Sequence, residues 1–459
     1  RAAAPHGFQM KLALASEELL KRTTSRCPTC NADSPAEVWK VTEGKQARIF
    51  LKRTCAEHGA VSNCISSDAR FYWLAQGDPQ NACCGGGTCS AGDGGVTGTL
   101  GRNAEGRREG PFEKLSTCLA LIEIVNSCNL SCPTCYADSP TGAGGKVDAV
   151  PLDDLKRRIE GVIERKGGIE LLQLSGGEPT LHPQFFELVE WATAHEKIDY
   201  LLLNTNGVRI AKDEAFAERL GKTFRYGGMQ LYLQFDGVQE QGQEFLRGGD
   251  FRAMRQKAIE RCEAMNLPVT LAMTVTPDNI PHLWEAIEFG LRYSHVRGVA
   301  FQPMFGSGRV PVEKQARLNT ADIILASVEQ SGGRLRYEDF TPLPCGDPNC
   351  ATIGYLLKTP LGVRSISEFI DFAEVQGFLR DKIKYSLNDL AQCGCESEPL
   401  GDLLKKFELD ETNTFRLFIK PFMDAWTWDE DRIDRCCTHV IRPDGKLDSF
   451  CRYYSAGAK

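Results

Sequence analysis

The sequence predicts an α/β fold in which six strands form a parallel sheet, open or closed as a barrel, between two cysteine-rich regions. From about residue 116, short apolar or alternating runs recur, and amphipathic stretches of helical period lie between most of them. The 19 cysteines instead gather mainly in an N-terminal group, a central triplet at residues 128–135 and a C-terminal group, and residues 136–344 contain only Cys262. In a chain of this size, such clustering indicates metal ligation rather than a disulfide framework.

The strand and helix patterns alternate in chain order. The predicted strands cover residues 119–126, 169–176, 199–206, 229–237, 268–275 and 297–304. The predicted helices between them cover residues 153–166, 185–195, 251–265 and 282–293. Because parallel strands end at one edge of their sheet, the residues that follow these strands are expected to form the functional site.

Four segments describe the expected organisation of the chain. They are a metal-binding module at 20–75, a glycine-rich connection at 76–115, the α/β barrel at 116–310 and a C-terminal cluster domain at 311–459. Beyond about residue 310 the strand pattern stops, so we expect helical segments to carry the second group of cysteines. The first ten residues, RAAAPHGFQM, are excluded from these predictions.

Composition excludes several classes of function. A hydrophobic content of 42% and a charged content of 25% are ordinary for a globular protein, and a net charge of −7 offers no basic surface for nucleic acid. No apolar run is long enough to span a bilayer, and no secretory pattern opens the chain. We therefore expect a cytoplasmic protein without a transmembrane segment, for which peripheral contact with a membrane stays open.

A cysteine motif follows the first predicted strand directly. The stretch NSCNLSCPTCY places Cys128, Cys132 and Cys135 in a C-x3-C-x2-C pattern. A cubane iron–sulfur cluster is usually held by four thiolates, so this motif leaves one iron without a protein ligand. One βα unit later, the second strand runs into SGGEP at residues 175–179.

This pairing of motifs resembles the radical S-adenosylmethionine (SAM) superfamily. In that family the open iron binds the amino and carboxylate groups of SAM, and an electron from the cluster cleaves SAM to a 5′-deoxyadenosyl radical. The resemblance implies that Cys128, Cys132 and Cys135 hold the cluster, and that a reduced flavodoxin or ferredoxin donates the electron. The residues expected to contact SAM are Gly176, Gly177 and Glu178 at its ammonium group, and Asn204, Thr205, Asn206, Gln234 and Asp236 at its ribose and carboxylate. No catalytic residue is assigned.

The outer cysteines resemble a narrower group. RCPTC followed by RTCAEHG, with SSDARFYW, PFMDAWTWDEDRIDRC and RPDGKLDSFC further on, is similar to the tetraether synthase group, which includes the class D radical methylases. That resemblance implies a rubredoxin-like N-terminal module with one mononuclear iron, and two auxiliary [4Fe–4S] clusters. With the open cluster these sites require about fifteen thiolates. The proposed ligands besides the central three are Cys27, Cys30, Cys55, Cys84, Cys89, Cys345, Cys350, Cys393, Cys395, Cys436, Cys437 and Cys451.

Three smaller features have a structural alternative. Cys27-x2-Cys30 with Cys55-x2-His58 also fits a zinc ribbon, although iron with a fourth thiolate from residues 83–89 is preferred here. Cys118 and Cys262 stand apart from the groups and are interpreted as small buried hydrophobes. The acidic run MDAWTWDEDRID is expected to be a solvated helix face.

Three functions are consistent with these motifs. The preferred one is a radical SAM enzyme that forms a C–C bond on an apolar, lipid-like substrate, held by buried area in a wide tunnel to which Phe301, Met304 and Phe305 would contribute. The alternative is a radical SAM methylase that uses a folate-type one-carbon donor on a pterin or other heterocycle, which needs fixed polar partners and a stacking aromatic ring. The third, an iron–sulfur electron carrier, does not account for GGEP.

Overall fold

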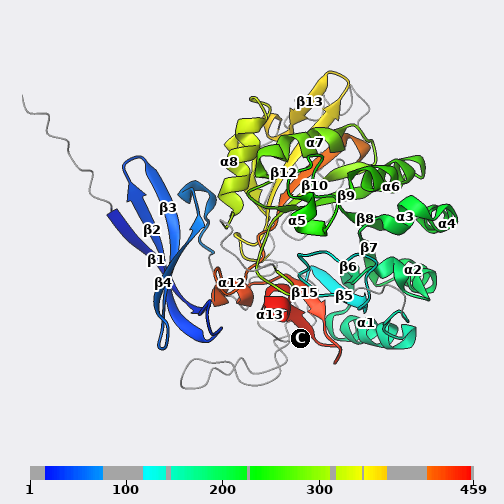
Figure 1. Cartoon of the computed structure of the whole chain (residues 1–459), viewed down its shortest axis with the longest axis horizontal. Helices are drawn as coiled ribbons and strands as arrows, with labels where there is room; N and C mark the ends of the chain where they lie inside the picture. Colours follow the sequence, from blue (N-terminus) through cyan, green and yellow to red (C-terminus); the bar gives the residue numbers. More distant parts are fainter. Residues whose placement is uncertain are drawn as a thin grey trace, which may run out of the picture.

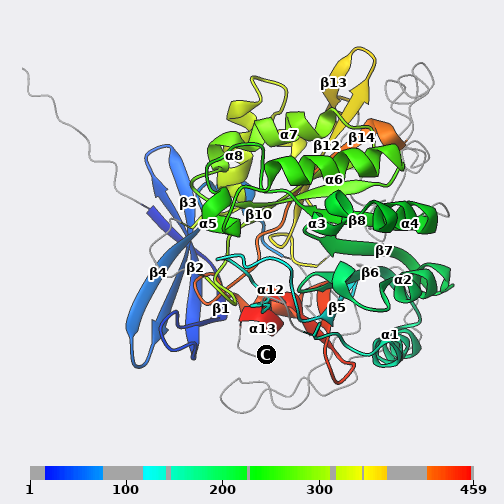
Figure 2. The same cartoon turned by 45° about the vertical axis from the view of Figure 1, so that its right-hand side comes forward.

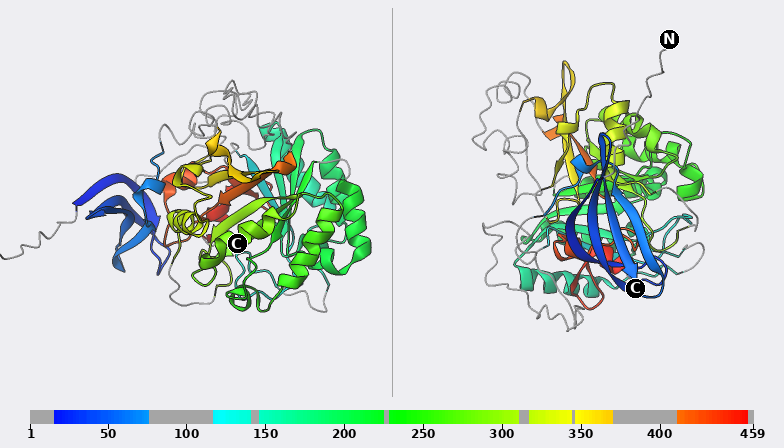
Figure 3. Two further views of the ribbon diagram at one scale, coloured as in Figure 1. Left: turned by 90° about the horizontal axis from the view of Figure 1, so that it is seen from above. Right: turned by 90° about the vertical axis from the view of Figure 1, so that its left-hand side faces the viewer.

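The computed structural model describes residues 16–75, 117–140, 146–224, 228–310, 317–343, 346–369 and 411–455. Two sheets organise them. A four-stranded antiparallel sheet forms an N-terminal module, and a larger mixed sheet forms the body of the molecule (Figure 1). Seen from above, the N-terminal module stands to one side of the body (Figure 3).

The centre of the larger sheet is a parallel run in the order β14-β10-β9-β8-β7-β6-β5-β15. The six predicted strands lie in the middle of this run, so the predicted α/β fold is confirmed. Their bounds are β5 (Leu119–Val125), β6 (Ile169–Gly176), β7 (Ile198–Thr205), β8 (Met229–Gln234), β9 (Val269–Val275) and β10 (Val296–Pro303).

Helices cover the outer face of this run, as Figures 1 and 2 show. In α1 the residues Leu155, Ile159 and Val162 are fully buried, and their spacing places them on the helix face that contacts the sheet. The helices are α1 (Leu152–Lys166), α2 (Phe185–Ala194), α3 (Val208–Lys212), α4 (Glu214–Phe224), α5 (Gln243–Arg247), α6 (Arg252–Ala264) and α7 (Leu283–Leu291). The four predicted helices correspond to α1, α2, α6 and α7. Within the described residues, none of the helices has the length and hydropathy needed to cross a membrane.

The prediction that strands stop near residue 310 is wrong for the described part of that region. β14 (Thr414–Ile419) and β15 (Thr438–Ile441) extend the parallel run at its two ends, and β12 (Thr352–Thr359) adds antiparallel to β14. Phe415, Leu417 and Ile419 are buried in alternate positions of β14, which is the pattern of a strand with one face in the core. The remaining elements of this region are α8 (Thr320–Gln330), β11 (Thr341–Pro342), β13 (Gly362–Ser365), α12 (Glu430–Asp434), β16 (Leu447–Ser449) and α13 (Phe450–Ser455).

The N-terminal module consists of β1 (Ser16–Arg26), β2 (Asp33–Glu43), β3 (Gln46–Cys55) and β4 (Gly59–Ser66), paired in chain order. Its small core contains Ala36, Val38, Ile49 and Leu51. The β1–β2 and β3–β4 turns lie at the same end of an antiparallel sheet, so the cysteines of both turns meet there.

The acidic run before Cys436 attaches this module to the body. The Lys21 ammonium lies 2.7 Å from Asp429 and 3.0 Å from Asp431, and the Arg53 guanidinium donates to the Trp426 carbonyl at 2.9 Å. Asp429 is 2% exposed, so the expectation of a solvated helix face is wrong at this residue. The N-terminal sheet covers the run, which sequence periodicity alone does not reveal.

Candidate active site

The two central motifs lie side by side at the carboxyl ends of β5 and β6. The Gly177 amide donates to the Val125 carbonyl at 2.7 Å, and the Glu178 amide donates to the Ser127 carbonyl at 3.0 Å. A Cβ atom at Gly176 or Gly177 would lie 2.1 Å from one of these same two carbonyl oxygens. Only glycine therefore allows the GGEP loop to approach the cysteine loop so closely.

The thiols of Cys128, Cys132 and Cys135 border one cavity. The pKa of Cys128 is raised to about 12, mainly by burial, and negative charge on Glu178 and on the other two thiolates contributes to this rise. Free thiolates are thus disfavoured here, and cationic iron would remove that penalty. The ligands of a single ion would all lie within about 4.8 Å of one another, and these three sulfur atoms do not. The donor set fits a multi-iron cluster.

Glu178 is fully buried and links the β6 loop to the end of β7. Its Oε1 accepts hydrogen bonds from the Thr180 hydroxyl at 2.6 Å and from the Thr205 hydroxyl at 2.7 Å, while Oε2 accepts from the Asn206 amide at 2.8 Å. Burial raises the pKa of Glu178 despite these bonds. Because a carboxylate oxygen has two lone pairs, Oε2 can accept a further donor such as an ammonium group.

The three predicted residues at the end of β7 point to different parts of the cavity. The side-chain amide of Asn206 donates from Nδ2 to Asn129 Oδ1 at 2.7 Å, which places this side chain beside the cysteine loop. The Thr205 hydroxyl donates to Glu178. Asn204 faces the barrel interior, where its Nδ2 donates to Ser175 Oγ at 3.1 Å. The structure therefore brings Thr205 and Asn206 to the cysteine end and Asn204 to the interior.

Asp236 does not line the cavity. It is fully buried, and its carboxylate accepts two hydrogen bonds from Arg247, at 2.7 and 2.9 Å, while Arg255 lies at 3.3 Å. Burial opposes ionisation, but the two guanidinium groups hold the pKa of Asp236 below its ordinary value. Arg247, rather than Asp236, borders the cavity. The side-chain amide oxygen of Gln234 is assigned to the side that faces Arg247, where it accepts a hydrogen bond from Arg247 Nε at 2.9 Å. Arg247 belongs to no recognisable motif, so sequence reasoning missed it.

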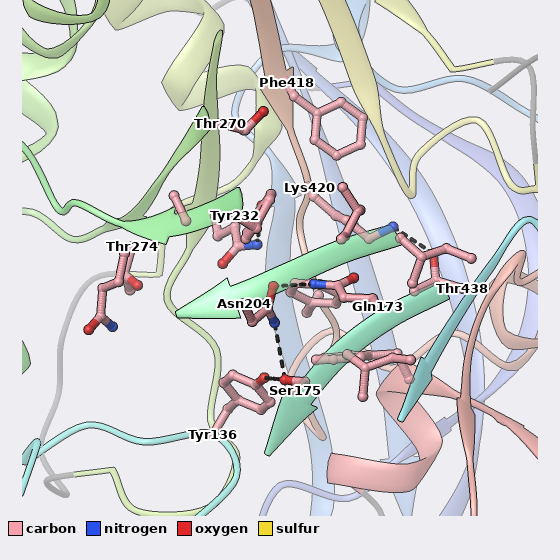
Figure 4. A pocket seen from close by; sticks show the side chains of 18 of the residues that line it. Tyr136, Gln173, Ser175, Asn204, Tyr232, Thr270, Thr274, Phe418, Lys420 and Thr438 are labelled. Carbon is pink, nitrogen blue, oxygen red and sulfur yellow. Dashed lines mark hydrogen bonds between the residues drawn. The ribbon is translucent and has the colours of Figure 1, made fainter. Parts of the chain in front are cut away.

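The cavity occupies about 460 Å³ and runs from the cysteine loop into the barrel. Polar side chains on one wall bind one another: Gln173 donates to Asn204, and Gln302 donates to the Tyr232 hydroxyl at 2.8 Å. Figure 4 shows Gln173, Asn204 and Ser175 joined in this way, with Tyr136 beside Ser175. The aromatic residues that line the cavity include Phe305, Phe418 and Phe422, whereas Phe301 is buried in the core outside it.

A second set of possible metal ligands lies at the tip of the N-terminal module. Ligand atoms of Cys27, Cys30, Cys55 and His58 all fall within 4.8 Å of one another. His58 thus occupies the fourth position of a mononuclear site, which favours the zinc-ribbon alternative over iron with a thiolate from residues 83–89. Cys84 and Cys89 lie outside the described residues.

Both sites match known families. Residues 122–290 match the radical SAM superfamily, and residues 19–67 match the HMPTM N-terminal zinc ribbon domain. The chain therefore contains a radical SAM superfamily domain. Its radical SAM region begins within β5 and ends in α7, so it includes the cysteine loop, GGEP and the ends of β7 and β8.

Named relatives of this radical SAM protein act on different molecules. It is 28% identical to the 7,8-dihydro-6-hydroxymethylpterin dimethyltransferase of Methanocaldococcus jannaschii, over 94% of this chain and 93% of that protein. It is 30% identical to a mycofactocin maturase of Mycobacterium tuberculosis, over 37% of this chain and 41% of that protein. The solved structure of Streptococcus suis SuiB bound to S-adenosylmethionine aligns over 43% of this chain and 41% of that one, with 16% identity and a TM-score of 0.33.

The C-terminal cysteines of this radical SAM protein form two groups near the cavity. Burial raises the pKa of Cys350 to about 11 and that of Cys451 to about 12, and Cys436 lies close enough to both that a thiolate there contributes to each rise. Cys437 instead contacts Cys118, which sequence analysis had set apart as a lone hydrophobe. Cys345, Cys393 and Cys395 lie outside the described residues, so the two auxiliary clusters stay a prediction. Cys262 lies fully buried in the main core, as expected.

The N-terminal site yields a prediction about metal content. Purified protein should hold one zinc ion in this module, and His58→Ala should weaken zinc binding by more than the roughly 10–100-fold that loss of an outer-shell partner causes. His58→Cys should restore binding, whereas Glu57→Ala, an exposed residue of the same turn, should change nothing. Competition with a chromophoric chelator measures the affinity. Unchanged affinity in His58→Ala would assign the fourth ligand to another residue.

Proposed function

We propose that this radical SAM enzyme is a methyltransferase that adds a methyl group to a carbon atom of a pterin or a related polar heterocycle. The observation that carries the proposal is the wall of paired amide and hydroxyl groups inside the barrel. The pterin dimethyltransferase that aligns with 94% of this chain supports the same substrate class.

The wall offers donors and acceptors at fixed positions on neighbouring strands. Gln173 and Asn204 come from β6 and β7, while Tyr232 and Gln302 come from β8 and β10. The lactam and amino groups of a heterocycle can form hydrogen bonds with these side chains in place of the bonds that the side chains make with one another. A site built this way rejects molecules that lack the matching groups. A hydrocarbon chain would supply neither donors nor acceptors, which is why the heterocycle is favoured over the lipid-like substrate preferred from sequence.

The residues around the cysteine loop suit the charged end of SAM. Glu178 Oε2 keeps acceptor capacity for the ammonium group, and the Arg247 guanidinium, held by Asp236, suits the carboxylate. When bound, the cluster and SAM supply a 5′-deoxyadenosyl radical that takes a hydrogen atom from carbon. The protein's own part is to orient the substrate and to exclude water from the cavity. The source of the methyl carbon, SAM or a folate-type donor, belongs to the same proposal.

Turnover with a defined pterin tests this function. Anaerobically reconstituted enzyme with SAM, dithionite and 6-hydroxymethyl-7,8-dihydropterin should form a product heavier by one or two methyl groups, as mass spectrometry would detect. Gln302→Leu should lower kcat/KM roughly 10–100-fold, equivalent to about 1.4–2.7 kcal/mol, because a buried partner is left unsatisfied. Gln241→Leu, at an exposed position, is the matched control. Turnover of an alkyl lipid with no effect of Gln302→Leu would contradict the proposal.

A further inference from the structure

Lys420 brings a cation into the cavity at the end of β14. Its ammonium group donates to the Thr438 hydroxyl at 2.7 Å, and the rings of Phe418 and Phe422 lie 6.0 and 5.6 Å away. An ammonium group has three donors, and within the described residues this one has no other hydrogen-bond partner. Two donors therefore remain for a ligand in the cavity that Lys420 lines, and Figure 4 shows the bond from Lys420 to Thr438.

Among the described residues, no carboxylate pairs with Lys420. Glu178 is the sole carboxylate that lines the cavity in the part of the chain that the structure describes, and it lies at the cysteine end. Of the other lining cations, Arg247 pairs with the buried Asp236 and Arg309 pairs with the exposed Asp138, while Arg297 lies on β10. Lys420 forms no ion pair with any described residue. A partly enclosed cation of this kind favours an anionic ligand.

Arg416 strengthens this bias. It precedes Lys420 on the same face of β14 and also lines the cavity, and its guanidinium donates to Gln230 Oε1 at 3.2 Å rather than to a carboxylate. Two cations, one on β14 and one directly after it, thus line the same cavity.

Lys420 also occupies the gap where the barrel is incomplete. β14 and β15 lie at opposite ends of the parallel run, and the hydrogen bond from Lys420 to Thr438 joins them across the cavity. A ligand oxygen that binds Lys420 would therefore lie beside the hydrogen bond that joins β14 to β15.

We propose that Lys420 is a specificity-determining residue that binds a negatively charged oxygen of the substrate, on a phosphate or a carboxylate group attached to the heterocycle. The oxyanion site rests on the geometry above, and only the identity of the attached ring rests on the proposed function. The ammonium group provides two charge-assisted hydrogen bonds to the oxyanion while it keeps its bond to Thr438.

Binding to SAM-loaded holoenzyme tests the proposal. The probes are 6-hydroxymethyl-7,8-dihydropterin, its phosphate ester and 6-carboxypterin, followed by their own fluorescence. Wild-type enzyme should bind at least one charged probe tenfold or more tightly than the neutral probe, and the tighter of the two identifies the oxyanion. Lys420→Met should abolish that preference while it leaves affinity for the neutral probe within twofold. Lys420→Arg should retain the preference, and Lys257→Met, which removes the same charge from the exposed face of α6, should change nothing.

Two further measurements keep the outcome decisive. If no pterin binds, the proposed function fails. Titration calorimetry with inorganic phosphate and acetate then tests the oxyanion site alone. Binding to wild type that is lost in Lys420→Met would support the oxyanion site. If Lys420→Met loses its cluster absorbance or melts early, Thr438→Val replaces it and should retain or increase affinity for the charged probe, because it frees the third donor. An unchanged preference in folded Lys420→Met, or no binding of either anion to wild type, would overturn the inference.

Discussion

Replacing Cys128, Cys132 and Cys135 together by Ala is expected to abolish SAM cleavage. Reduced wild-type protein should release 5′-deoxyadenosine and methionine from SAM, and the triple variant should release neither, because its cluster has no ligands left. The variant should also lose about four irons per chain. Chromatography of the nucleoside products and iron analysis after anaerobic reconstitution measure both effects.

Cys262→Ala is the matched control for this variant. Cys262 is also a buried thiol, but it lies on α6 in the main core rather than at the cavity. Its loss should cost some stability and leave SAM cleavage intact. Cleavage by the triple variant at the wild-type rate would end the assignment of the cluster to these three residues.

Asp236→Ala is expected to cause the largest loss of stability. It would leave Arg247 and Arg255 buried without a counter-charge, and removing one partner of such a buried pair costs about 3–5 kcal/mol. Because the two guanidinium groups lower the pKa of Asp236 below 3.8, its contribution is present above that pH and disappears as the pH falls through the folded-state pKa. Urea unfolding of wild type and variant at neutral and acidic pH should show the difference shrink.

Two variants serve as controls for Asp236→Ala: one breaks an exposed ion pair, and the other replaces all three buried charges by apolar side chains. Asp250→Ala breaks the pair with Arg252 on the surface, and it should change the free energy of unfolding little, because solvent screens such pairs. Replacing Asp236 by Leu together with Arg247 and Arg255 by Met should recover much of the stability, since no charge is left buried. If Asp236→Ala unfolds at the same urea concentration as wild type, the buried ion pair does not contribute to the free energy of unfolding as expected.

The central sheet was predictable because its six strands are apolar or alternating runs and a helix pattern lies between most of them. β14 and β15 were not predictable, because residues 414–419 and 438–441 are short segments and no regular alternation of strand and helix patterns precedes them. Both strands owe their positions to partners far away in sequence, β10 and β5. Local periodicity contains no information about such long-range pairing.

The candidate site shows the same division. Cys128, Glu178 and Asn206 follow strands, and the parallel sheet brings strand ends together, so their proximity could be anticipated. The position of Asp236 could not, because the left-handed backbone at φ 60° turns its side chain away from the cavity toward two arginines. Cys118 is buried, as predicted, but its place against Cys437 could not be anticipated, since only the pairing of β15 with β5 brings the two together.

The pairing of β15 with β5 also affects how the protein matures. Thr438 is in register with Leu119, so on the ribosome β5 and the cysteine loop after it emerge long before their neighbouring strand exists. Until then the first residues of β5 have an edge of unpaired backbone groups. The edge strand of the parallel run is therefore completed only when residues 438–441 have been synthesised.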